Sequence, residues 1–403
     1  MTRSGCHATP PPAWVLAVLL AGCSGGGGGS GSGAAPATPG STTTAPPPPA
    51  AATPPAGADA ALRITALQTF EEPWAMAALP DGRLLVTSKP GRLFLVEPGV
   101  RVGEVRGVPQ VAYNRQGGLG DVVLHPGFPG NGWIYLSYAE PDAAGRSGAA
   151  VARARLVTGA DGGGELADLQ VLWRQLPKVD GEAHYSHRIA FGADGLLWIS
   201  SGDRYRGEPA QDPGSGLGKL LRLRDDGSAP RDNPFAGQGG TAAQVWSLGH
   251  RNVLGLAFDG QGQLWMAEMG PRGGDELNRA QREANFGWPR VSDGDDYDGS
   301  PIPDHATAPQ FAAPSLTWTP VISPSSLVFY SGAEFPEWRG QALLGGLSAR
   351  ALVRVAFDGL GPREVARHAL GARIREVEQA PDGALYVLED GPRGRLLRLQ
   401  ARR

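Results

Sequence analysis

The sequence contains very little lysine, almost no cysteine and no long hydrophobic run. Its 37 basic residues include only the lysines Lys89, Lys178 and Lys219, and its formal net charge is −3. Because no run of basic residues exists to follow a phosphate backbone, the composition argues against a nucleic-acid binder. The apolar run Ala13–Leu20 near the N-terminus has eight residues. It is too short to span a bilayer, which takes about 20.

The N-terminus has the pattern of an export signal. Arg3 supplies a positive charge ahead of the apolar run, which ends in Leu20-Ala21-Gly22-Cys23. This ending resembles the processing box of bacterial lipoproteins. We therefore predict a signal peptide over residues 1–22, lipidation of Cys23, and a periplasmic protein that its lipid alone anchors to a bacterial membrane. Plain secretion with cleavage nearby is the alternative. Removal of Cys6 with the signal leaves Cys23 as the only cysteine, so we expect no disulfide.

Residues 23–61 are low in sequence complexity. Gly25–Gly33 is rich in Gly and Ser, the following part is rich in Pro, Ala and Thr, and Asp59 is the only charged residue. Such a segment cannot bury a core and is typical of a tether. The globular domain is then expected over residues 62–403, about 340 residues, a length that invites a search for internal repeats.

A short phrase recurs through the globular part: a glycine turn, a spacer and an apolar strand. Asp-Gly and Asn-Gly are hairpin-turn dipeptides, and the β-branched and aromatic runs after them favour strands. Four clear copies begin at Pro80, Ala193, Gly260 and Pro381, and two looser copies begin at Gly130 and Trp338. Six copies of about 57 residues predict an all-β fold, a six-bladed β-propeller with four-stranded blades and long loops between blades. A pair of β-sandwiches is the alternative. Residues 279–285 are one of the few helical candidates.

Polar clusters lie between the repeat phrases, where a propeller places its chemistry on loops at one mouth of its channel. They are Gln116–Asp121, His184–Arg188, Ser201–Asp203, Gly249–Asn252, Glu268–Glu276 and Arg373–Arg375. The last cluster puts two guanidinium groups on one face if the stretch is extended, since side chains alternate with period two. Each cluster alone also fits a structural role, such as a hydrogen-bonding histidine or a solvated acidic turn.

The clusters are more specific together than singly. They combine an imidazole, a carboxylate, the amides Gln116 and Asn252, and the arginines Arg188, Arg251, Arg373 and Arg375. Guanidinium groups bind carboxylates through two parallel hydrogen bonds and stack on planar rings. The set therefore suits a flat, polyanionic, carbonyl-rich ligand.

Seven motifs occur in a fixed order from about Trp74 to Leu399. They are Gln-Gly-Gly-Leu, His-x-Ser-x-Arg, Gly-Asp, Gly-His-Arg-Asn, Gly-Pro-x-x-x-Asp-Glu-x-Asn, Asn-Phe-Gly-Trp-Pro and Arg-x-Arg-x-Val. This order resembles the glucose/sorbosone dehydrogenase family and, more narrowly, the soluble aldose sugar dehydrogenases that use pyrroloquinoline quinone. The resemblance implies a six-bladed propeller with the quinone in a cleft at one mouth, in agreement with the repeat count.

The resemblance also implies a role for each matching position. His184 would be the general base that takes the proton from the sugar's anomeric hydroxyl while the C1 hydride passes to the quinone, and Asp203 would orient its imidazole. The quinone-contacting positions are Gln116, Arg251, Asn252, Arg373, Arg375 and, as a weaker candidate, Tyr297. Calcium would be held by the quinone and by the backbone oxygens of Gly270 and Pro271, with a second calcium near Glu276 and the carbonyl of Phe286. The substrate would be an aldose sugar. Electrons would pass to an external acceptor, because the sequence has no Cys-x-x-Cys-His haem motif.

Two positions depart from the family's pattern. Ser348 stands where glucose-oxidising members carry a quinone-contacting lysine, with Arg350 two residues away, and His187 stands where a small residue is usual. Because of these departures, a family member with an altered substrate or with little activity is a further alternative. Two further alternatives are a lipid-tethered propeller that binds a sugar or cell-wall fragment without catalysis, and a lactone-hydrolysing calcium propeller. The latter needs a cage of carboxylates around its metal.

Overall fold

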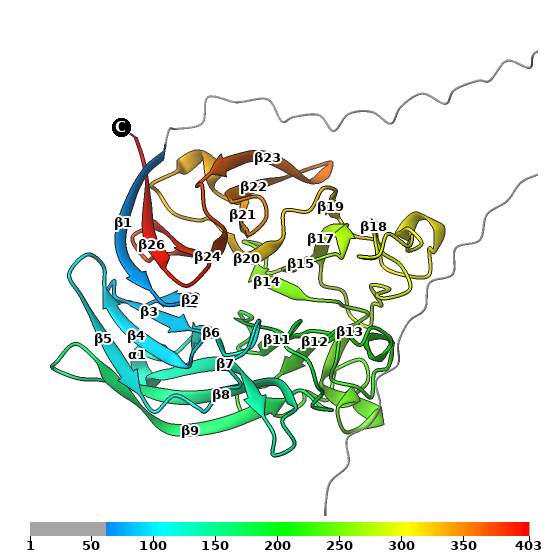
Figure 1. Ribbon diagram of the computed structural model, residues 1–403, viewed down its shortest axis with the longest axis horizontal. Helices are drawn as coiled ribbons and strands as arrows, with labels where there is room; N and C mark the ends of the chain where they lie inside the picture. The colour runs from blue at the N-terminus through cyan, green and yellow to red at the C-terminus, as the bar shows by residue number, and fades with distance from the viewer. Residues whose placement is uncertain (1–61, 403) are drawn as a thin grey trace, which may run out of the picture. The chain divides into compact units, whose positions relative to one another are not determined.

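The computed structural model describes residues 62–402, which Figure 1 shows as a succession of β-sheets around a common centre. The predicted signal peptide (1–22), Cys23 and the predicted tether (23–61) lie outside the described residues. The only α-helix within residues 62–402 is the single turn α1 (Phe128–Asn131). The predicted all-β fold is confirmed. No helix in this part of the chain has the length and apolar character needed to cross a membrane.

The chain forms consecutive antiparallel meanders of four strands. The first two are β2 (Pro73–Ala78), β3 (Leu84–Ser88), β4 (Arg92–Glu97) and β5 (Arg101–Arg106), and then β6 (Leu119–Leu124), β7 (Trp133–Pro141), β8 (Ser147–Thr158) and β9 (Gly164–Arg174). Parallel pairing of β5 with β9 joins these two into one eight-stranded sheet. The third is β10 (Ser186–Phe191), β11 (Leu197–Ser201), β12 (Lys219–Leu223) and β13 (Val245–Leu248). The next two are β14 (Val253–Phe258), β15 (Leu264–Glu268), β17 (Asp275–Arg279) and β19 (Leu316–Trp318), and then β20 (Pro324–Phe329), β21 (Ala342–Gly346), β22 (Ala351–Asp358) and β23 (Gly361–Ala369).

The last sheet contains both ends of the described chain. Its strand order is β1-β26-β25-β24, with β1 (Leu62–Phe70), β24 (Ile374–Gln379), β25 (Leu385–Glu389) and β26 (Gly394–Ala401). The remaining elements are the ribbon of β16 (Arg272–Gly273) and β18 (Gly294–Asp295), and the 3₁₀ helices η1 (Glu208–Gln211), η2 (Ala236–Gln238), η3 (Ala242–Gln244), η4 (His305–Thr307) and η5 (Pro336–Trp338). Pairing of β1 with β26 fastens the N-terminal strand to the C-terminal sheet.

Each repeat phrase of the sequence becomes the second strand of a meander. The clear copies form β3, β11, β15 and β25, and the looser copies form β7 and β21. In the clear copies and in β21, all five strand residues are buried. Neighbouring sheets cover both faces of these strands, which explains why the sequence shows short continuous apolar runs instead of alternation. The predicted pattern of a turn followed by an apolar strand is confirmed.

The first strands of the meanders surround the centre of the fold. They contact one another in a closed cycle, β2–β6–β10–β14–β20–β24 and back to β2. Each carries a register shift close to its first residue, between Pro73/Met76, Leu119/Val122, Ser186/Ile189, Val253/Gly255, Pro324/Ser326 and Ile374/Glu376. Such bulges bend a strand and change the direction of its side chains, and they are common beside active sites. The shared irregularity marks the end of the fold at which functional side chains are expected.

Hydrophobic side chains fill the space between successive sheets. One cluster joins Tyr135 and Val151 of the second meander to Ile199 and Leu221 of the third. Another joins the β20–β23 sheet to the last sheet. The sheets therefore stabilise one another face to face, and the loops at the rim are free to carry function.

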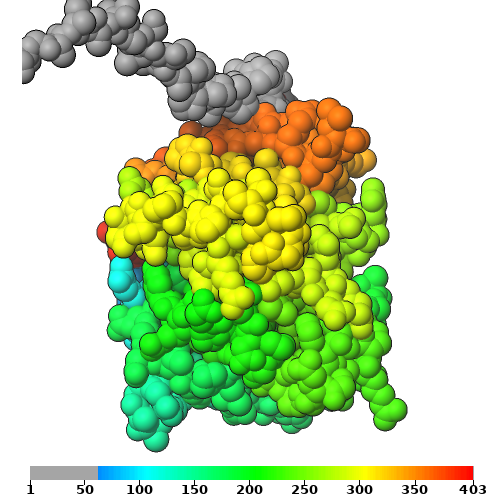
Figure 2. Space-filling view, turned by 90° about the vertical axis from the view of Figure 1, so that its right-hand side faces the viewer, coloured from blue at the N-terminus to red at the C-terminus, as the bar shows by residue number. Residues whose placement is uncertain are grey.

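The predicted helix at residues 279–285 is wrong. Arg279 ends β17, and the following residues form a turn and a β-bridge. The backbone of this segment forms hydrogen bonds with strand β13, since Leu248 N donates to Ala284 O (3.0 Å) and Phe286 N donates to Leu248 O (2.9 Å). The long connection between β17 and β19, yellow-green to yellow in Figure 2, continues from there over the outer surface. It carries Trp288 and Tyr297 toward the site.

Candidate active site

A cavity of about 360 Å³ opens at the bulged end of the first strands. Its walls come from residues at the start of first strands and residues directly after second strands. The lining residues are Glu72, Trp74, Lys89, Arg115, Gln116, Tyr185, Ser186, His187, Asn252, Leu254, Met269, Ser323, Leu347, Arg373, Arg375, Asp390 and Gly391. Four predicted quinone-contacting residues, Gln116, Asn252, Arg373 and Arg375, are among them.

His184 lies beside this cavity and is almost completely buried, with 3% of its surface exposed. Its backbone N–H donates to Gln116 Oε1 (2.9 Å), and its Nδ1 lies 2.7 Å from Asp203 Oδ1. The Tyr205 ring stacks on the imidazole with centroids 3.7 Å apart. Burial lowers the pKa of His184 below its ordinary value, although the hydrogen bond with Asp203 opposes that effect. The imidazole is therefore neutral near pH 7. Nδ1–H donates to the carboxylate, and Nε2 makes no hydrogen bond within residues 62–402.

The backbone around His184 is unusual and firmly held. His184, Ser186 and His187 all have positive φ angles, of 51°, 55° and 51°. A side chain at Gly202 would overlap the His184 carbonyl, so only glycine allows this close approach. The buried guanidinium of Arg204 donates to the carbonyls of Ala183 (2.8 Å), Ser147 (2.6 Å) and Gly181 (2.6 Å). These bonds fix the loop that carries the histidine.

Asp203 is held from three directions. Besides His184, its carboxylate accepts hydrogen bonds from Trp288 Nε1 (2.7 Å) and from the Tyr205 backbone N–H (3.0 Å). Burial alone would raise the pKa of Asp203, but the hydrogen bond with His184 and the charge of Arg251 hold it below its ordinary value. The carboxylate is therefore ionised and fixed in place against the imidazole.

Arg251 and Tyr297 lie together at the edge of the cavity without lining it. Arg251 Nη2 donates to the Tyr297 hydroxyl (3.0 Å), and Nη1 donates to the carbonyls of Met269 and Gly270 (3.0 Å each). The guanidinium also packs over the ring of Trp288, at 5.2 Å. The predicted Arg251 is thus brought next to the His184–Asp203 pair.

The carboxylate of Glu268 holds the Gly-His-Arg-Asn motif in place. Its carboxylate accepts the backbone N–H groups of Arg251 and of Asn252 (3.1 Å), and lies 3.0 Å from His250 Nδ1. One buried side chain therefore fixes three consecutive residues. On the cavity side, Asn252 Oδ1 accepts a hydrogen bond from Ser186 Oγ (3.1 Å).

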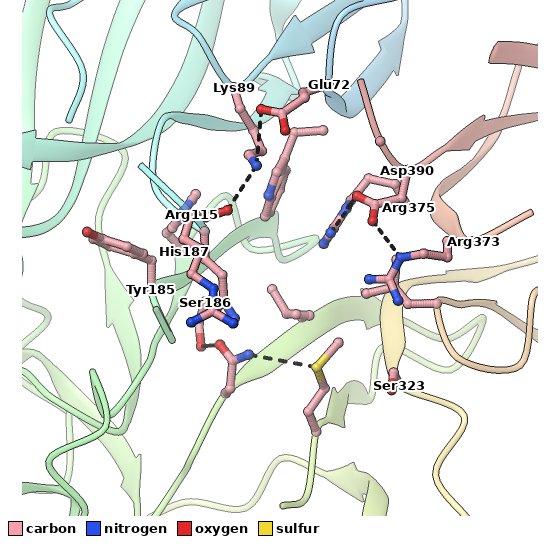
Figure 3. A pocket seen from close by; sticks show the side chains of 17 residues that line it. Glu72, Lys89, Arg115, Tyr185, Ser186, His187, Ser323, Arg373, Arg375 and Asp390 are labelled. Atoms are coloured by element: carbon pink, nitrogen blue, oxygen red, sulfur yellow. Dashed lines mark hydrogen bonds and ion pairs between the residues drawn. The ribbon is translucent and has the colours of Figure 1, made fainter. Parts of the chain in front are cut away.

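The predicted arrangement of Arg373 and Arg375 on one face is confirmed. Arg373 Nε donates to Asp390 Oδ2 (2.8 Å), and Arg375 donates to Asp390 Oδ1 through Nη2 (2.7 Å) and Nε (2.9 Å). Burial opposes ionisation of Asp390, but the two guanidinium groups lower its pKa to about 2. Asp390, which sequence reasoning missed, thus holds both arginines at the cavity wall (Figure 3).

Arg188 does not join this set. Its guanidinium packs over the Trp74 ring at 4.1 Å, donates to Leu254 O (2.8 Å), and pairs with Asp121 (3.3 Å) and Glu376 (2.5 Å). Arg188 is not among the described residues that line the cavity. Arg188 therefore pairs with two carboxyl side chains in the centre of the fold and does not face this cavity.

His187 forms part of the cavity wall. Its ring stacks on Trp74 with centroids 5.0 Å apart, and its Nδ1 lies 2.7 Å from Ser137 Oγ. Burial lowers the pKa of His187 to about 3. It therefore stays neutral near pH 7 and adds no second group that titrates there. At the other departing position, Ser348 Oγ donates to Val321 O (3.0 Å), while its neighbour Leu347 lines the cavity.

A second, much smaller cavity of about 10 Å³ is lined by three of the four predicted calcium-binding residues, and Pro271 is not among them. Gly270, Glu276 and Phe286 line it with Glu268. Burial, reinforced by the negative charge of Glu268, raises the pKa of Glu276 well above its ordinary value. Glu276 is therefore not part of a solvated acidic turn. Residues 62–402 contain no group of three or more His, Cys, Asp or Glu side chains arranged to hold a metal.

The sequence was compared with models of known protein families. The family model for glucose/sorbosone dehydrogenase matches residues 70–398. The chain belongs to the glucose/sorbosone dehydrogenase family. It is therefore an oxidoreductase, and the family resemblance predicted from the seven motifs is confirmed.

Individual relatives agree with this assignment. The aldose sugar dehydrogenase YliI of Escherichia coli is 37% identical over 354 residues, covering 86% of this chain and 94% of the relative. The crystal structure of the soluble aldose sugar dehydrogenase of E. coli in its apo form has a TM-score of 0.80 at 37% identity, covering 85% of this chain and 100% of that one. The aldose sugar dehydrogenase of Streptomyces coelicolor in its PQQ-bound form has a TM-score of 0.67 at 28% identity, covering 86% and 99%.

Proposed function

We propose that this protein is a quinoprotein that oxidises the C1 hydroxyl of aldose sugars to the lactone. The observation that carries the proposal is the buried His184–Asp203 pair beside a cavity lined with cations and amides. An external carrier takes the electrons, because the sequence offers no haem motif of its own.

The cavity suits pyrroloquinoline quinone chemically. Its volume of about 360 Å³ is in the range of cofactor sites. Arg373 and Arg375 offer guanidinium donors to carboxylates, and the amides Gln116 and Asn252 can bond carbonyl oxygens. When bound there, the quinone supplies the two-electron acceptor for the hydride that leaves C1. Arg251 and Tyr297, at the edge of the cavity, would add a guanidinium and a hydroxyl to the groups that hold the cofactor.

His184 acts as the general base. A neutral imidazole whose Nδ1–H is held by a carboxylate presents the lone pair of Nε2, which accepts the proton of the anomeric hydroxyl. Asp203 then stabilises the imidazolium and keeps the ring in its working orientation. The Tyr205 ring covers the imidazole and keeps water from its face.

Calcium completes the proposal. Calcium accepts carbonyl and carboxylate oxygens, so the backbone oxygens of Gly270 and Pro271 would hold one ion together with the quinone. The guanidinium of Arg251 now bonds Gly270 O, so it would have to share or release that oxygen. A second ion would lie near Glu276 and Phe286 O, where its charge would offset two buried carboxylates.

The architecture and location belong to the same proposal. The closed cycle of first strands supports a six-bladed propeller, with β5–β9 pairing as a local link between two blades. We further propose a lipoprotein with lipidated Cys23, exported to the periplasm and held on a membrane by its lipid.

The test uses purified protein supplied with pyrroloquinoline quinone and calcium, and follows dye reduction with several aldoses. Sugar-dependent reduction supports the dehydrogenase. Absence of both dye reduction and a change in quinone absorbance at saturating cofactor would refute it. Sugar binding without turnover would instead support the non-catalytic carbohydrate-binding alternative.

A further inference from the structure

We propose that Lys89 binds a carboxylate of the cofactor, on the wall of the cavity opposite Arg373 and Arg375. This inference rests on the proposed function, since it concerns the same cavity. The position at which the family resemblance implies a quinone-contacting lysine holds Ser348, whose Oγ donates to Val321 O. Lys89 is the only lysine that lines the cavity, and it reaches it from a different sheet.

The position of Lys89 in the fold is that of a functional residue. It directly follows the second strand β3, as Asp390 directly follows β25. Figure 3 shows Lys89, Glu72 and Arg115 on one side of the cavity and Arg373, Arg375 and Asp390 on another. A flat ligand with carboxylates at separate edges would thus meet cations on both sides.

The backbone of Lys89 is fixed by its neighbours. Its N–H donates to Glu72 O and its carbonyl accepts Leu119 N–H, both at 3.0 Å. Gly118 has a φ of 117°, and a side chain there would overlap the Lys89 carbonyl. The second glycine of the Gln-Gly-Gly-Leu motif is therefore required by the backbone of residue 89. The same contact ties the lysine to the loop that carries Gln116.

The ammonium group keeps the capacity to bind a ligand. Its Nζ lies 3.2 Å from Glu72 Oε2 and donates to Arg115 O (3.0 Å), and 13% of the side chain is exposed. An ammonium has three N–H donors, so one is left for an incoming carboxylate. Glu72 also accepts the Tyr113 hydroxyl (2.7 Å) and so keeps a partner if the ammonium turns toward a ligand.

Lys178 provides a matched control. Its Nζ pairs with Glu140 (2.6 Å), donates to Pro141 O (3.1 Å), and 13% of the side chain is exposed. Lys89 and Lys178 are therefore alike in burial, acidic partner and carbonyl acceptor, but Lys178 is absent from the lining of this cavity. Substituting each by methionine removes one ammonium from a similarly buried, similarly paired position.

The experiment titrates pyrroloquinoline quinone into cofactor-free protein with calcium, and follows tryptophan fluorescence as Trp74 in the cavity wall is quenched. We expect Lys89→Met to raise the dissociation constant about 10- to 100-fold, the usual loss for a hydrogen bond to a charged group, and Lys178→Met to leave it unchanged. Equal affinity of wild type and Lys89→Met would overturn the proposal. If wild type itself binds no quinone, the proposed function fails instead, so the two failures are distinguishable.

The variant Glu72→Gln distinguishes two roles for Lys89, binding the cofactor and stabilising the segment that contains Arg115. If Lys89 contacts the cofactor, removing its internal carboxylate partner frees the ammonium, and quinone should bind more tightly. If Lys89 only stabilises the segment that contains Arg115, with Glu72 as its partner, both Lys89→Met and Glu72→Gln should weaken quinone binding. That joint weakening, in variants whose Tm matches that of wild type, would overturn the proposal.

Discussion

The Nδ1 atom of His184 lies 2.7 Å from Oδ1 of Asp203, and both side chains are almost completely buried. A carboxylate at this position fixes the proton on Nδ1, so Nε2 is the nitrogen that can accept one. Trp288 and the Tyr205 backbone hold the carboxylate in turn. The base is therefore oriented by residues between β11 and β12 and by one residue of the long connection between β17 and β19.

Replacing Asp203 by asparagine should slow turnover without removing the cofactor. The amide would no longer fix the tautomer or stabilise the imidazolium, so we expect a loss of about 10²- to 10⁴-fold in kcat. Steady-state dye reduction at saturating quinone measures this. Asp194→Asn, an exposed aspartate in a surface turn, is the control. A normal kcat in Asp203→Asn would remove Asp203 from its orienting role.

Replacing His184 by alanine should abolish turnover while quinone still binds. The side chain of His184 does not line the main cavity, so its removal leaves the cationic wall intact. Quinone binding followed by fluorescence, together with dye reduction on the same preparation, separates the two effects. Turnover close to wild type in this variant would show that another group takes the proton.

The pH dependence of kcat/KM should reflect the lowered pKa of His184. The base works only when unprotonated, so activity is present above its pKa and is lost as the pH falls through it. Because burial lowers this pKa, the acid limb should lie below about 6.5, the unperturbed value. Tyr205→Ala exposes the imidazole and should move the limb to higher pH. Tyr205→Phe keeps the stacked ring and should leave the limb in place. An unmoved limb in Tyr205→Ala contradicts this account.

Calcium should stabilise the protein more at high pH than at low pH. Burial raises the pKa of Glu276, so a cation competes with a proton for this carboxyl, and binding weakens as the pH falls. The rise in Tm on adding calcium should therefore be larger at about pH 8 than at about pH 5. In Glu276→Gln most of this rise should disappear. An equal rise in that variant places the stabilising calcium elsewhere.

Much of the fold could be predicted from the sequence because its signals are local. The turn-and-strand phrase is read within eight residues, and it marked the second strand of each meander. The placement of Arg373 and Arg375 on one face was predicted from strand alternation, although β24 begins only at Ile374 and Asp390 is what holds both side chains. The wrong helix at 279–285 failed for a non-local reason, since its hydrogen bonds go to β13.

The missed site residues depend on contacts between sheets. Asp390 matters because it bonds Arg373 and Arg375, and Lys89 because it faces them from a distant part of the chain. A usable signal existed nevertheless. Lys89 and Asp390 directly follow the second strands β3 and β25, close to the position that Asp203 holds after β11, so this position could have been searched after every repeat phrase.

Gly202→Ala should damage the site through the backbone of the base. A β-carbon at this position overlaps the His184 carbonyl, so either strand β11 or the His184 loop must shift. We expect a loss of about 1–3 kcal/mol in the free energy of unfolding, together with a fall in kcat. Gly130→Ala is the matched control, because a β-carbon there meets no atom within 4 Å. Thermal unfolding and dye reduction are measured on both variants. If Gly202→Ala kept the stability and kcat of Gly130→Ala, the His184 loop would be more adaptable than its hydrogen bonds with Arg204 and Gln116 imply.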